Sequence, residues 1–534
     1  MIEKRGMNGM NWKTRLTAGL LAGVAALSLT GCASTPASPA AEAEKTAAVM
    51  QDTAVYAAGK TPKYVFLFIG DGMSYPQFQA AADYLGAVAD PDYVKAEPSI
   101  ALEDRDGAVL NGPKALNFME FDVAGSAVTY DSCSFAPDSA STATSIATGH
   151  KTYSGMINVD ETGTKEYETI AEQLHAQKGW KIGVISSVNL NHATPAAFYA
   201  HQASRNNYYE IGTELVESGF EYFAGGALLK PNGADGDQTS LYELAEQAGY
   251  LVTDTQAEAE QVTAQDGKVI LIDEHLADSD SMDYELDRPD GQWALADYVE
   301  KGIEVLDNDK GFFMMCEGGK IDWACHANDA GSTVADTVAL ADAVQVAVDF
   351  AKEHPNDTLI LVTGDHETGG LSIGFAGTDY DTYLSNLASQ KISYAKFDEE
   401  YVAAYKANKT PFETAMKDVE ELFGLNLPTG GAGNRLTLTS YEIQRLKDAY
   451  QLAMTDYDSD AYTQEQYVLY GTYNPFSVTI THILNNKSGV DFTSYSHTGL
   501  PVAVFADGVG AEAFGGYYDN TQIYAKLASM LKVQ

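Results

Sequence analysis

Residues 64–72 read YVFLFIGDG, an apolar run that ends in an aspartate between two glycines. A short apolar run bounded by glycine is typical of a strand that is buried on both faces of a sheet. The flanking glycines let the backbone turn sharply and leave the Asp71 carboxylate free to face a cation, although Gly-Asp-Gly is also an ordinary turn. The stretch therefore predicts a buried strand with a polar residue at its carboxyl end.

Similar apolar runs recur along the chain, with helical segments between them. The predicted strands are 64–69, 125–130, 181–186, 269–272, 311–316, 358–362 and 501–505. Between two of them, apolar residues from 334 to 348 recur at three- or four-residue spacing, which is typical of a helix that packs one face on a sheet. Further helices are expected at 167–177, 241–248 and 520–531. This alternation predicts an α/β fold with a central, mostly parallel sheet flanked by helices on both faces.

The stretch from about 377 to 494 breaks the alternation with polar helical patterns. Residues 376–496 hold 13 of the 32 tyrosines, so the segment presents an unusual aromatic surface. We interpret it as a tyrosine-rich helical insertion into a single domain that spans 61–534. It could cover a site, contact a second subunit or simply cover additional sheet surface, and the last is the default expectation.

The composition favours a globular protein and excludes some functions. Of the 534 residues, 45% are hydrophobic and 20% charged, which excludes disorder, collagen and coiled coil as the main architecture. The 75 acidic and 33 basic residues give a net charge of −42, which repels nucleic acid. An anionic substrate would need a local cluster of cations. The acidic run 278–290 is most simply a solvated loop.

The first residues predict a targeting signal. Lys4, Arg5, Lys13 and Arg15 precede the apolar stretch 16–29, which leads into Gly31-Cys32. This resembles a bacterial lipoprotein signal, and the resemblance implies cleavage after residue 31, a lipid on Cys32 that anchors the protein to a membrane, and a location in the periplasm or at the cell surface. Residues 32–60 would be a flexible tether. A plain secretory signal or an uncleaved anchor is the alternative.

Cys133, Cys316 and Cys325 are the cysteines beyond this signal. An odd number cannot form a complete disulfide framework, so stability must come from the core. One bridge is possible in an oxidising compartment, but the sequence does not select the pair. Cys316 is expected to pack in the core.

Polar residues gather at the ends of the predicted strands, where ligands bind in open parallel sheets. Asp138-Ser139 precedes a helix-like segment. A serine at a helix N-terminus lies among unpaired N–H groups that favour an alkoxide and a phosphate, although either residue could merely cap the helix. Glu317, Asp322 and His326 follow a later strand. Their oxygen and imidazole donors suit Zn²⁺ or a similar divalent ion.

Two further motifs complete the pattern: Asp365-His366 ends another strand, and His497 precedes the last one. Together the motifs resemble the alkaline phosphatase family in content and order, from about Lys63 to the C-terminus apart from the insertion. The segments are Gly70-Asp71-Gly72, Asp138-Ser139-Ala140, His192-Ala193-Thr194-Pro195, Arg205, the group Glu317, Asp322 and His326, then Asp365-His366 and His497-Thr498-Gly499.

The resemblance implies hydrolysis of phosphate monoesters in which Ser139 forms a covalent phosphoserine. It implies one Zn²⁺ held by Asp322, His326 and His497, a second held by Asp71, Asp365 and His366, and one Mg²⁺ held by Asp71, Thr194 and Glu317. Arg205 would grip two phosphate oxygens, with Asp138 orienting its guanidinium. A homodimer is also possible.

Two positions depart from the best-known bacterial form of the family. His192 stands in place of an aspartate near the Mg²⁺ site, which would weaken Mg²⁺ relative to Zn²⁺. Trp323 stands in place of a lysine, so phosphate would be held less tightly. Two other functions stay open: a phosphodiesterase or nucleotide pyrophosphatase on the same scaffold, and a phosphate-binding lipoprotein without turnover.

Overall fold

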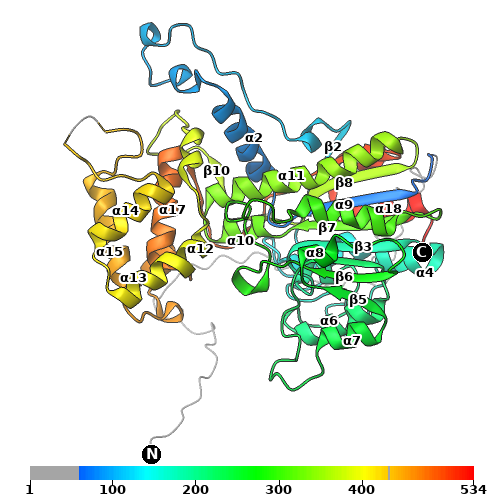
Figure 1. The fold of residues 1–534 in the computed structure, drawn as a ribbon. Coiled ribbons are helices and arrows are strands. Elements are labelled where there is room, and N and C mark those ends of the chain that lie inside the picture. The colour runs from blue at the N-terminus through cyan, green and yellow to red at the C-terminus, as the bar shows by residue number, and fades with distance from the viewer. Residues whose placement is uncertain (1–58, 431–432) are drawn as a thin grey trace, which may run out of the picture. The chain divides into compact units, whose positions relative to one another are not determined.

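A computed structural model describes residues 59–430 and 433–534, which are built around one ten-stranded sheet (Figure 1). The predicted signal, Cys32 and nearly all of the predicted tether lie outside the described residues. The strands run in the order β14-β2-β13-β8-β1-β7-β3-β4-β6-β5. Their bounds are Tyr64–Gly70 (β1), Val123–Val128 (β2), Lys181–Asn189 (β3), Tyr222–Gly226 (β4), Tyr250–Thr253 (β5), Lys268–Ile272 (β6), Phe312–Gly318 (β7), Thr358–Gly364 (β8), Val502–Gly508 (β13) and Gly516–Asp519 (β14).

Among these described strands β13 alone runs antiparallel to its neighbours, so the prediction of a mostly parallel sheet is confirmed. Each predicted strand exists, but the one expected at 125–130 lies at 123–128. Strands β4, β5 and β14 were not predicted. They are only four or five residues long, and glycines interrupt the apolar pattern of β4 and open β14.

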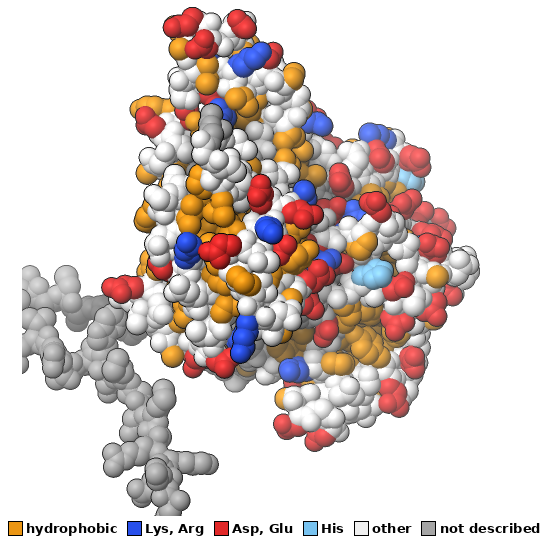
Figure 2. All heavy atoms as spheres, turned by 60° about the vertical axis from the view of Figure 1, so that its left-hand side comes forward, with side chains coloured by type: hydrophobic (Ala, Val, Ile, Leu, Met, Phe, Trp, Pro, Cys, Tyr) orange, Lys and Arg blue, Asp and Glu red, His pale blue; other side chains and the backbone are white. Residues whose placement is uncertain are grey.

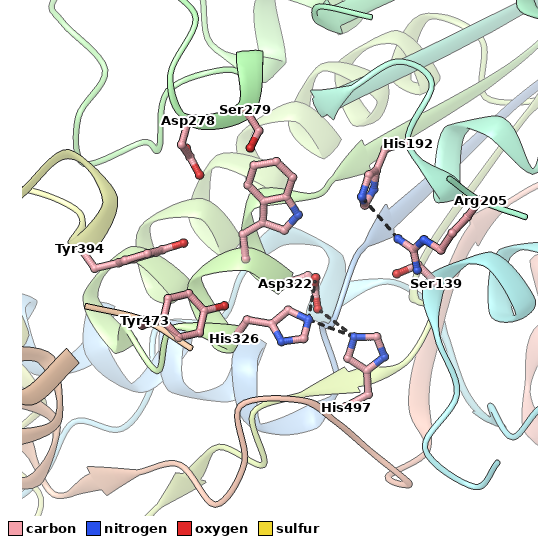
Figure 3. A pocket seen from close by; sticks show the side chains of 11 residues that line it. Ser139, His192, Arg205, Asp278, Ser279, Asp322, His326, Tyr394, Tyr473 and His497 are labelled. Carbon is pink, nitrogen blue, oxygen red and sulfur yellow. Dashed lines mark hydrogen bonds and ion pairs between the residues drawn. The ribbon is translucent and has the colours of Figure 1, made fainter. Parts of the chain in front are cut away.

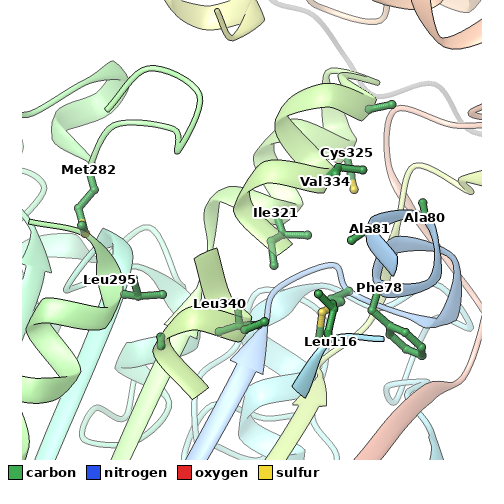
Figure 4. Packing of buried hydrophobic residues seen from close by; sticks show 14 of the residues in the cluster. Phe78, Ala80, Ala81, Leu116, Met282, Leu295, Ile321, Cys325, Val334 and Leu340 are labelled. Carbon is green, nitrogen blue, oxygen red and sulfur yellow. The ribbon is translucent and has the colours of Figure 1, made fainter. Parts of the chain in front are cut away.

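Successive residues of β1 face opposite sides of the sheet, and a different set of helices covers each side. Phe66 and Phe68 pack into a cluster with α2 (Tyr75–Ala89), α9 (Leu295–Leu306), α10 (Lys320–His326) and α11 (Ala330–Glu353), part of which Figure 4 shows. Val65 and Leu67 pack against the helices α3 (Ser139–Thr148), α4 (Ile170–Lys178), α5 (Ala193–Ala196), α6 (Tyr208–Ser218), α7 (Leu241–Gln247) and α18 (Thr521–Leu531). The flanking of the sheet on both faces is thus confirmed.

The tyrosine-rich segment is helical. The chain leaves the sheet domain after two short strands and returns through two others that pair with them. Antiparallel strands β10 (Ser372–Ile373) and β11 (Val490–Asp491) lie at its base, and β9 (Glu367–Thr368) pairs with β12 (His497–Thr498) beside them. Its helices are α12 (Tyr394–Phe397), α13 (Ala403–Asn408), α14 (Phe412–Phe423), α15 (Ser440–Ala453), α16 (Gln464–Tyr470) and α17 (Pro475–Ser488). Helix α17 is mostly buried, and its Phe476 and Ile480 belong to the same cluster as the sheet.

Acidic side chains are spread widely over the face shown in Figure 2, with few basic ones between them. All three cysteines in the described residues have free thiols: Cys133 is exposed, whereas Cys316 and Cys325 are buried, as expected for Cys316. Within residues 59–430 and 433–534, no helix combines the length and the apolar character needed to cross a membrane.

Candidate active site

The predicted site residues meet at one edge of the sheet because its topology brings their strand ends together. Asp71 follows β1, Glu317 lies near the end of β7 and Asp365 follows β8. These parallel strands end at the same edge. Strand β13 runs antiparallel to β8, so it begins at the edge where β8 ends. His497 shortly precedes β13 and therefore lies at the same edge.

Ser139 is the first residue of α3, and its buried hydroxyl lies 3.1 Å from His366 Nε2. Asp138 caps the helix by accepting a hydrogen bond from the Ser141 N–H at 3.1 Å. Since the cap is supplied by Asp138, the Ser139 hydroxyl remains free to face His366. The positive end of the helix dipole favours negative charge at this point.

Backbone carbonyls determine which ring nitrogens of His326 and His497 carry protons. His326 Nδ1 lies 2.6 Å from the Tyr495 carbonyl and His497 Nδ1 lies 2.5 Å from the Pro137 carbonyl. Because a carbonyl only accepts, each Nδ1 is the donor and each neutral ring presents a lone pair at Nε2. The two Nε2 atoms are 3.1 Å apart, and Asp322 Oδ2 is 3.3 Å from that of His326. These three groups converge as ligands of one cation would.

The Asp322 carboxylate favours positive charge on the neighbouring His326 ring. Burial opposes the charged imidazole, but the Asp322 carboxylate raises the pKa of His326 to about 8. Burial also lowers the pKa of His497. The arrangement thus attracts positive charge, which fits the predicted Zn²⁺ ligands.

Thr368 links the two predicted zinc groups. Its hydroxyl donates to Asp322 Oδ1 at 2.6 Å and accepts from His366 Nδ1 at 3.2 Å, which leaves the His366 Nε2 lone pair free. That atom lies 3.3 Å from both Asp71 Oδ1 and Asp365 Oδ2. The sequence analysis missed Thr368, although it lies two residues after His366 in a strand-like segment.

Three carboxyl groups, those of Asp71, Asp365 and Glu317, are buried in this part of the site. Burial, and then the neighbouring carboxylates, raise the pKa of Asp71 well above its usual range, while burial chiefly raises those of Asp365 to about 8 and Glu317 to about 7. Among the described residues, none donates a hydrogen bond to Asp71 Oδ1 or Glu317 Oε1. Thr194 Oγ1 lies 3.3 Å from Asp71 Oδ2. These oxygens fit divalent cations.

Ligand atoms from two sets of residues each lie within 4.8 Å of one another: Asp322, His366 and His497, and Asp71, Asp365 and His366. His366 belongs to both sets, whereas the resemblance divides the ligands differently and adds His326 to the first. The two groups of side chains are therefore adjacent and have His366 in common.

Arg205 lies above Ser139 and is held by two neighbours. Its Nη1 donates to Asp138 Oδ2 at 2.9 Å, and its Nη2 lies 3.4 Å from His192 Nε2. Burial, and then the Arg205 charge, lower the pKa of His192 to about 3, so His192 is neutral. The His192 ring meets the Trp323 ring edge-on at 6.0 Å.

A pocket of about 340 Å³ is lined by seven of the predicted residues, namely Ser139, His192, Arg205, Asp322, Trp323, His326 and His497. The same pocket also contains residues not predicted from the sequence, namely Asp278, Ser279, Tyr394 and Tyr473 (Figure 3). Two expectations are wrong here. The insertion does not simply cover sheet surface, because Tyr394 and Tyr473 line the pocket. The acidic run is not merely solvated, because Asp278 accepts a hydrogen bond at 2.6 Å from the fully buried Lys320.

The insertion also holds the segment around His326 and His497 in place through a chain of hydrogen bonds. His482 of α17 lies 3.1 Å, at Nε2, from Asn328 Oδ1, and the Asn328 side-chain amide donates to the Ser494 carbonyl at 2.8 Å. The next residue, Tyr495, accepts the hydrogen bond from His326. A half-buried histidine in the insertion therefore positions the segment that leads to His497.

The alkaline phosphatase family model matches residues 62–533. "Alkaline phosphatase 4" of Bacillus subtilis (strain 168) is 30% identical over 489 residues, which cover 90% of each chain. Alkaline phosphatase of Escherichia coli (strain K12) is 29% identical over 351 residues, 58% of this chain and 70% of that protein. The crystal structure of a cold-active alkaline phosphatase from Shewanella sp. has a TM-score of 0.69 and 27% identity, and covers 88% of this chain and 99% of that chain. The chain therefore belongs to the alkaline phosphatase family and is a metal-dependent phosphoric monoester hydrolase.

Proposed function

We propose that Ser139 is the nucleophile of this phosphatase and that the reaction proceeds through a phosphoserine. The observation that carries the proposal is the position of the Ser139 hydroxyl, at the N-terminus of α3 and 3.1 Å from His366 Nε2. His366 in turn faces Asp71 and Asp365. A serine in this environment can be deprotonated and can receive a dianionic phosphate.

Three cations would complete the site. Asp322, His326 and His497 would hold one Zn²⁺, Asp71, Asp365 and His366 a second, and Asp71, Thr194 and Glu317 a Mg²⁺. When bound, such ions neutralise the phosphate, lower the pKa of hydroxyl groups and stabilise the leaving oxygen. The unpaired oxygens of Asp71 and Glu317 and the converging imidazole lone pairs support this assignment.

The protein's own groups account for binding and orientation. The Ser139 oxygen attacks phosphorus, the bond from phosphorus to the leaving oxygen breaks, and an alcohol departs. Water then cleaves the phosphoserine and releases inorganic phosphate. Arg205 presents two N–H groups to non-bridging oxygens, and its hydrogen bond to Asp138 holds the guanidinium over Ser139. Since recognition is centred on phosphate, the enzyme should accept many leaving groups.

Parallel assays of p-nitrophenyl phosphate and bis(p-nitrophenyl) phosphate test the reaction. We expect faster turnover of the monoester, because Arg205 and the Mg²⁺ group would stabilise the second negative charge of a monoester dianion, which a diester lacks. Ser139→Ala should lose about a thousandfold or more in kcat while keeping its zinc content. Ser145→Ala is the matched control, since Ser145 is buried in the same helix and bonds only the Ser141 carbonyl.

Trapping with radiolabelled substrate followed by an acid quench should label wild-type protein on Ser139. Faster diester turnover would favour the phosphodiesterase. Phosphate binding without product release would favour the binding protein. An unaltered rate in Ser139→Ala would refute the nucleophile.

We also propose that Cys32 carries a lipid and anchors the enzyme outside the cytoplasm, as the signal-like segment before it implies. Radiolabelled palmitate should label the wild-type protein and not Cys32→Ala. We further propose that the protein forms a homodimer, which light scattering of the purified protein would detect as twice the chain mass. Loss of either result would refute the corresponding proposal.

A further inference from the structure

We propose that the outer part of the pocket is a binding site for a flat aromatic leaving group with N–H donors, as in a nucleoside 5′-monophosphate. The inference rests on the proposed function, because it assigns the part of the pocket that phosphate does not use. The inner part contains Ser139, Arg205 and the ligating side chains. The remaining lining residues are Trp323, Tyr394 and Tyr473 together with Asp278 and Ser279.

The pocket divides into these two parts in Figure 3. Ser139 and Arg205 lie at one end, whereas Tyr394, Tyr473 and Asp278 lie at the other, with Asp322 and His326 between them. A leaving group attached to phosphate at Ser139 must extend away from Ser139, which is toward the tyrosines. The volume of about 340 Å³ lies at the lower end of the range of about 300–1,000 Å³ for small-molecule sites, and a phosphate alone would leave most of it unfilled.

The aromatic rings at the outer end are fixed by their own packing. The Tyr394 ring is edge-on to that of Tyr473, with centroids 5.5 Å apart, and its hydroxyl lies 3.2 Å from the Tyr284 hydroxyl. The Tyr473 ring also contacts that of Tyr495 at 6.3 Å. Rings that are already ordered lose little conformational entropy when a ligand stacks on them.

Trp323 also lines the pocket. The ammonium of Lys320 lies 4.7 Å from its ring centroid, and Trp323 packs with Tyr394 and Tyr473 in one cluster. The indole remains half-buried, so part of it is open to the pocket. Any flat aromatic ring can stack on such a surface, whichever base it belongs to, whereas a sugar or a small alkyl chain gains less binding free energy there.

The charge at the outer end selects against anionic leaving groups. Asp278 is the acidic residue there, and 31% of its side chain is exposed. Its contact with Lys320 neutralises the pair, yet the carboxylate still accepts hydrogen bonds from ring N–H groups. A leaving group that carries a second phosphate would meet this carboxylate and the surrounding negative surface. The site should therefore favour nucleoside monophosphates over diphosphates.

The test compares adenosine 5′-monophosphate with ribose 5-phosphate, which has the same leaving alcohol without the base. We expect the metal-loaded wild-type enzyme to show a kcat/KM for the nucleotide at least tenfold above that for the sugar phosphate. Tyr473→Leu should lower this ratio about tenfold, the order expected for loss of one base–aromatic stack, through the nucleotide alone. Tyr473→Phe keeps the ring and should restore the ratio.

Tyr441→Leu is the matched control, since Tyr441 is an exposed tyrosine of the insertion that does not line the pocket, and it should leave both constants unchanged. Equal kcat/KM values for the two substrates in the wild type, or a Tyr473→Leu variant with an unchanged ratio, would overturn the subsite while leaving the phosphatase proposal intact. Failure of the wild type to hydrolyse either substrate would instead count against the proposed function.

Discussion

Thr368→Val should weaken zinc binding although Thr368 is not a predicted ligand. The substitution keeps the shape of the side chain and removes the hydroxyl that donates to Asp322 Oδ1 at 2.6 Å and accepts from His366 Nδ1 at 3.2 Å. The site is buried, so water cannot readily replace the hydroxyl. A hydrogen bond to a charged group contributes about 1.5–3 kcal/mol. Because every 1.4 kcal/mol is about tenfold, zinc affinity should fall roughly 10- to 100-fold.

The measurement is a zinc titration in competition with a chromophoric chelator, which reports affinity independently of activity. Thr337→Val is the control: Thr337 is fully buried in α11, and its hydroxyl donates only to the Thr333 carbonyl. Wild-type zinc affinity in Thr368→Val would refute the linking role of this hydroxyl. An equal loss in both variants would show that any buried hydroxyl matters through stability alone.

Five further outcomes are expected. Gly72→Ala should cost about 1–2 kcal/mol in chemical denaturation, because Gly72 has φ +69° and its added Cβ would also crowd the zinc ligands; an unchanged midpoint would contradict this. His192→Asp should strengthen activation by Mg²⁺, and Trp323→Lys should strengthen inhibition by phosphate; no change in either would reject the assigned effects. Because the pKa of Asp365 is raised to about 8, zinc affinity should weaken as pH falls below 8, and calorimetry should detect proton release on zinc binding; because the pKa of Glu317 is raised to about 7, Mg²⁺ affinity should weaken as pH falls below 7. The chelated protein should lose stability as pH rises from about 4 to about 8, since over this range the folded state keeps protons on Glu317 and Asp365 that the unfolded chain releases; a thermal midpoint that rises over this range would contradict the assignment.

The sequence could predict those parts of the site that lie next to strands. Asp71 and Asp365 follow apolar runs directly, and the geometry of a parallel sheet brings the ends of such runs together. Tyr473 and Asp278 could not be placed in this way, because their positions depend on how the insertion and a surface loop pack against α10. Lys320 is a similar case: a lysine is rarely buried, and its burial depends on a carboxylate about forty residues earlier in the chain.

The short strands were missed for a different reason. Four-residue strands such as β5 and β14 gain most of their order from neighbours in the sheet, so they carry little periodicity of their own. The direction of β13 also depends on the connection through the insertion, which no local pattern specifies.

The paired strands β9 and β12 make this region of the chain unusually tolerant of evolutionary change. The chain leaves the sheet domain after β9 and returns at β12, and these two strands pair with each other. Each doubling of the length of the intervening segment therefore raises the free-energy cost of loop closure by only about 0.6 kcal/mol. A descendant that kept α17 and exchanged the preceding helices would retain its reaction centre and acquire a different outer wall. Substrate specificity can therefore change by replacement of these helices while the reaction itself stays the same.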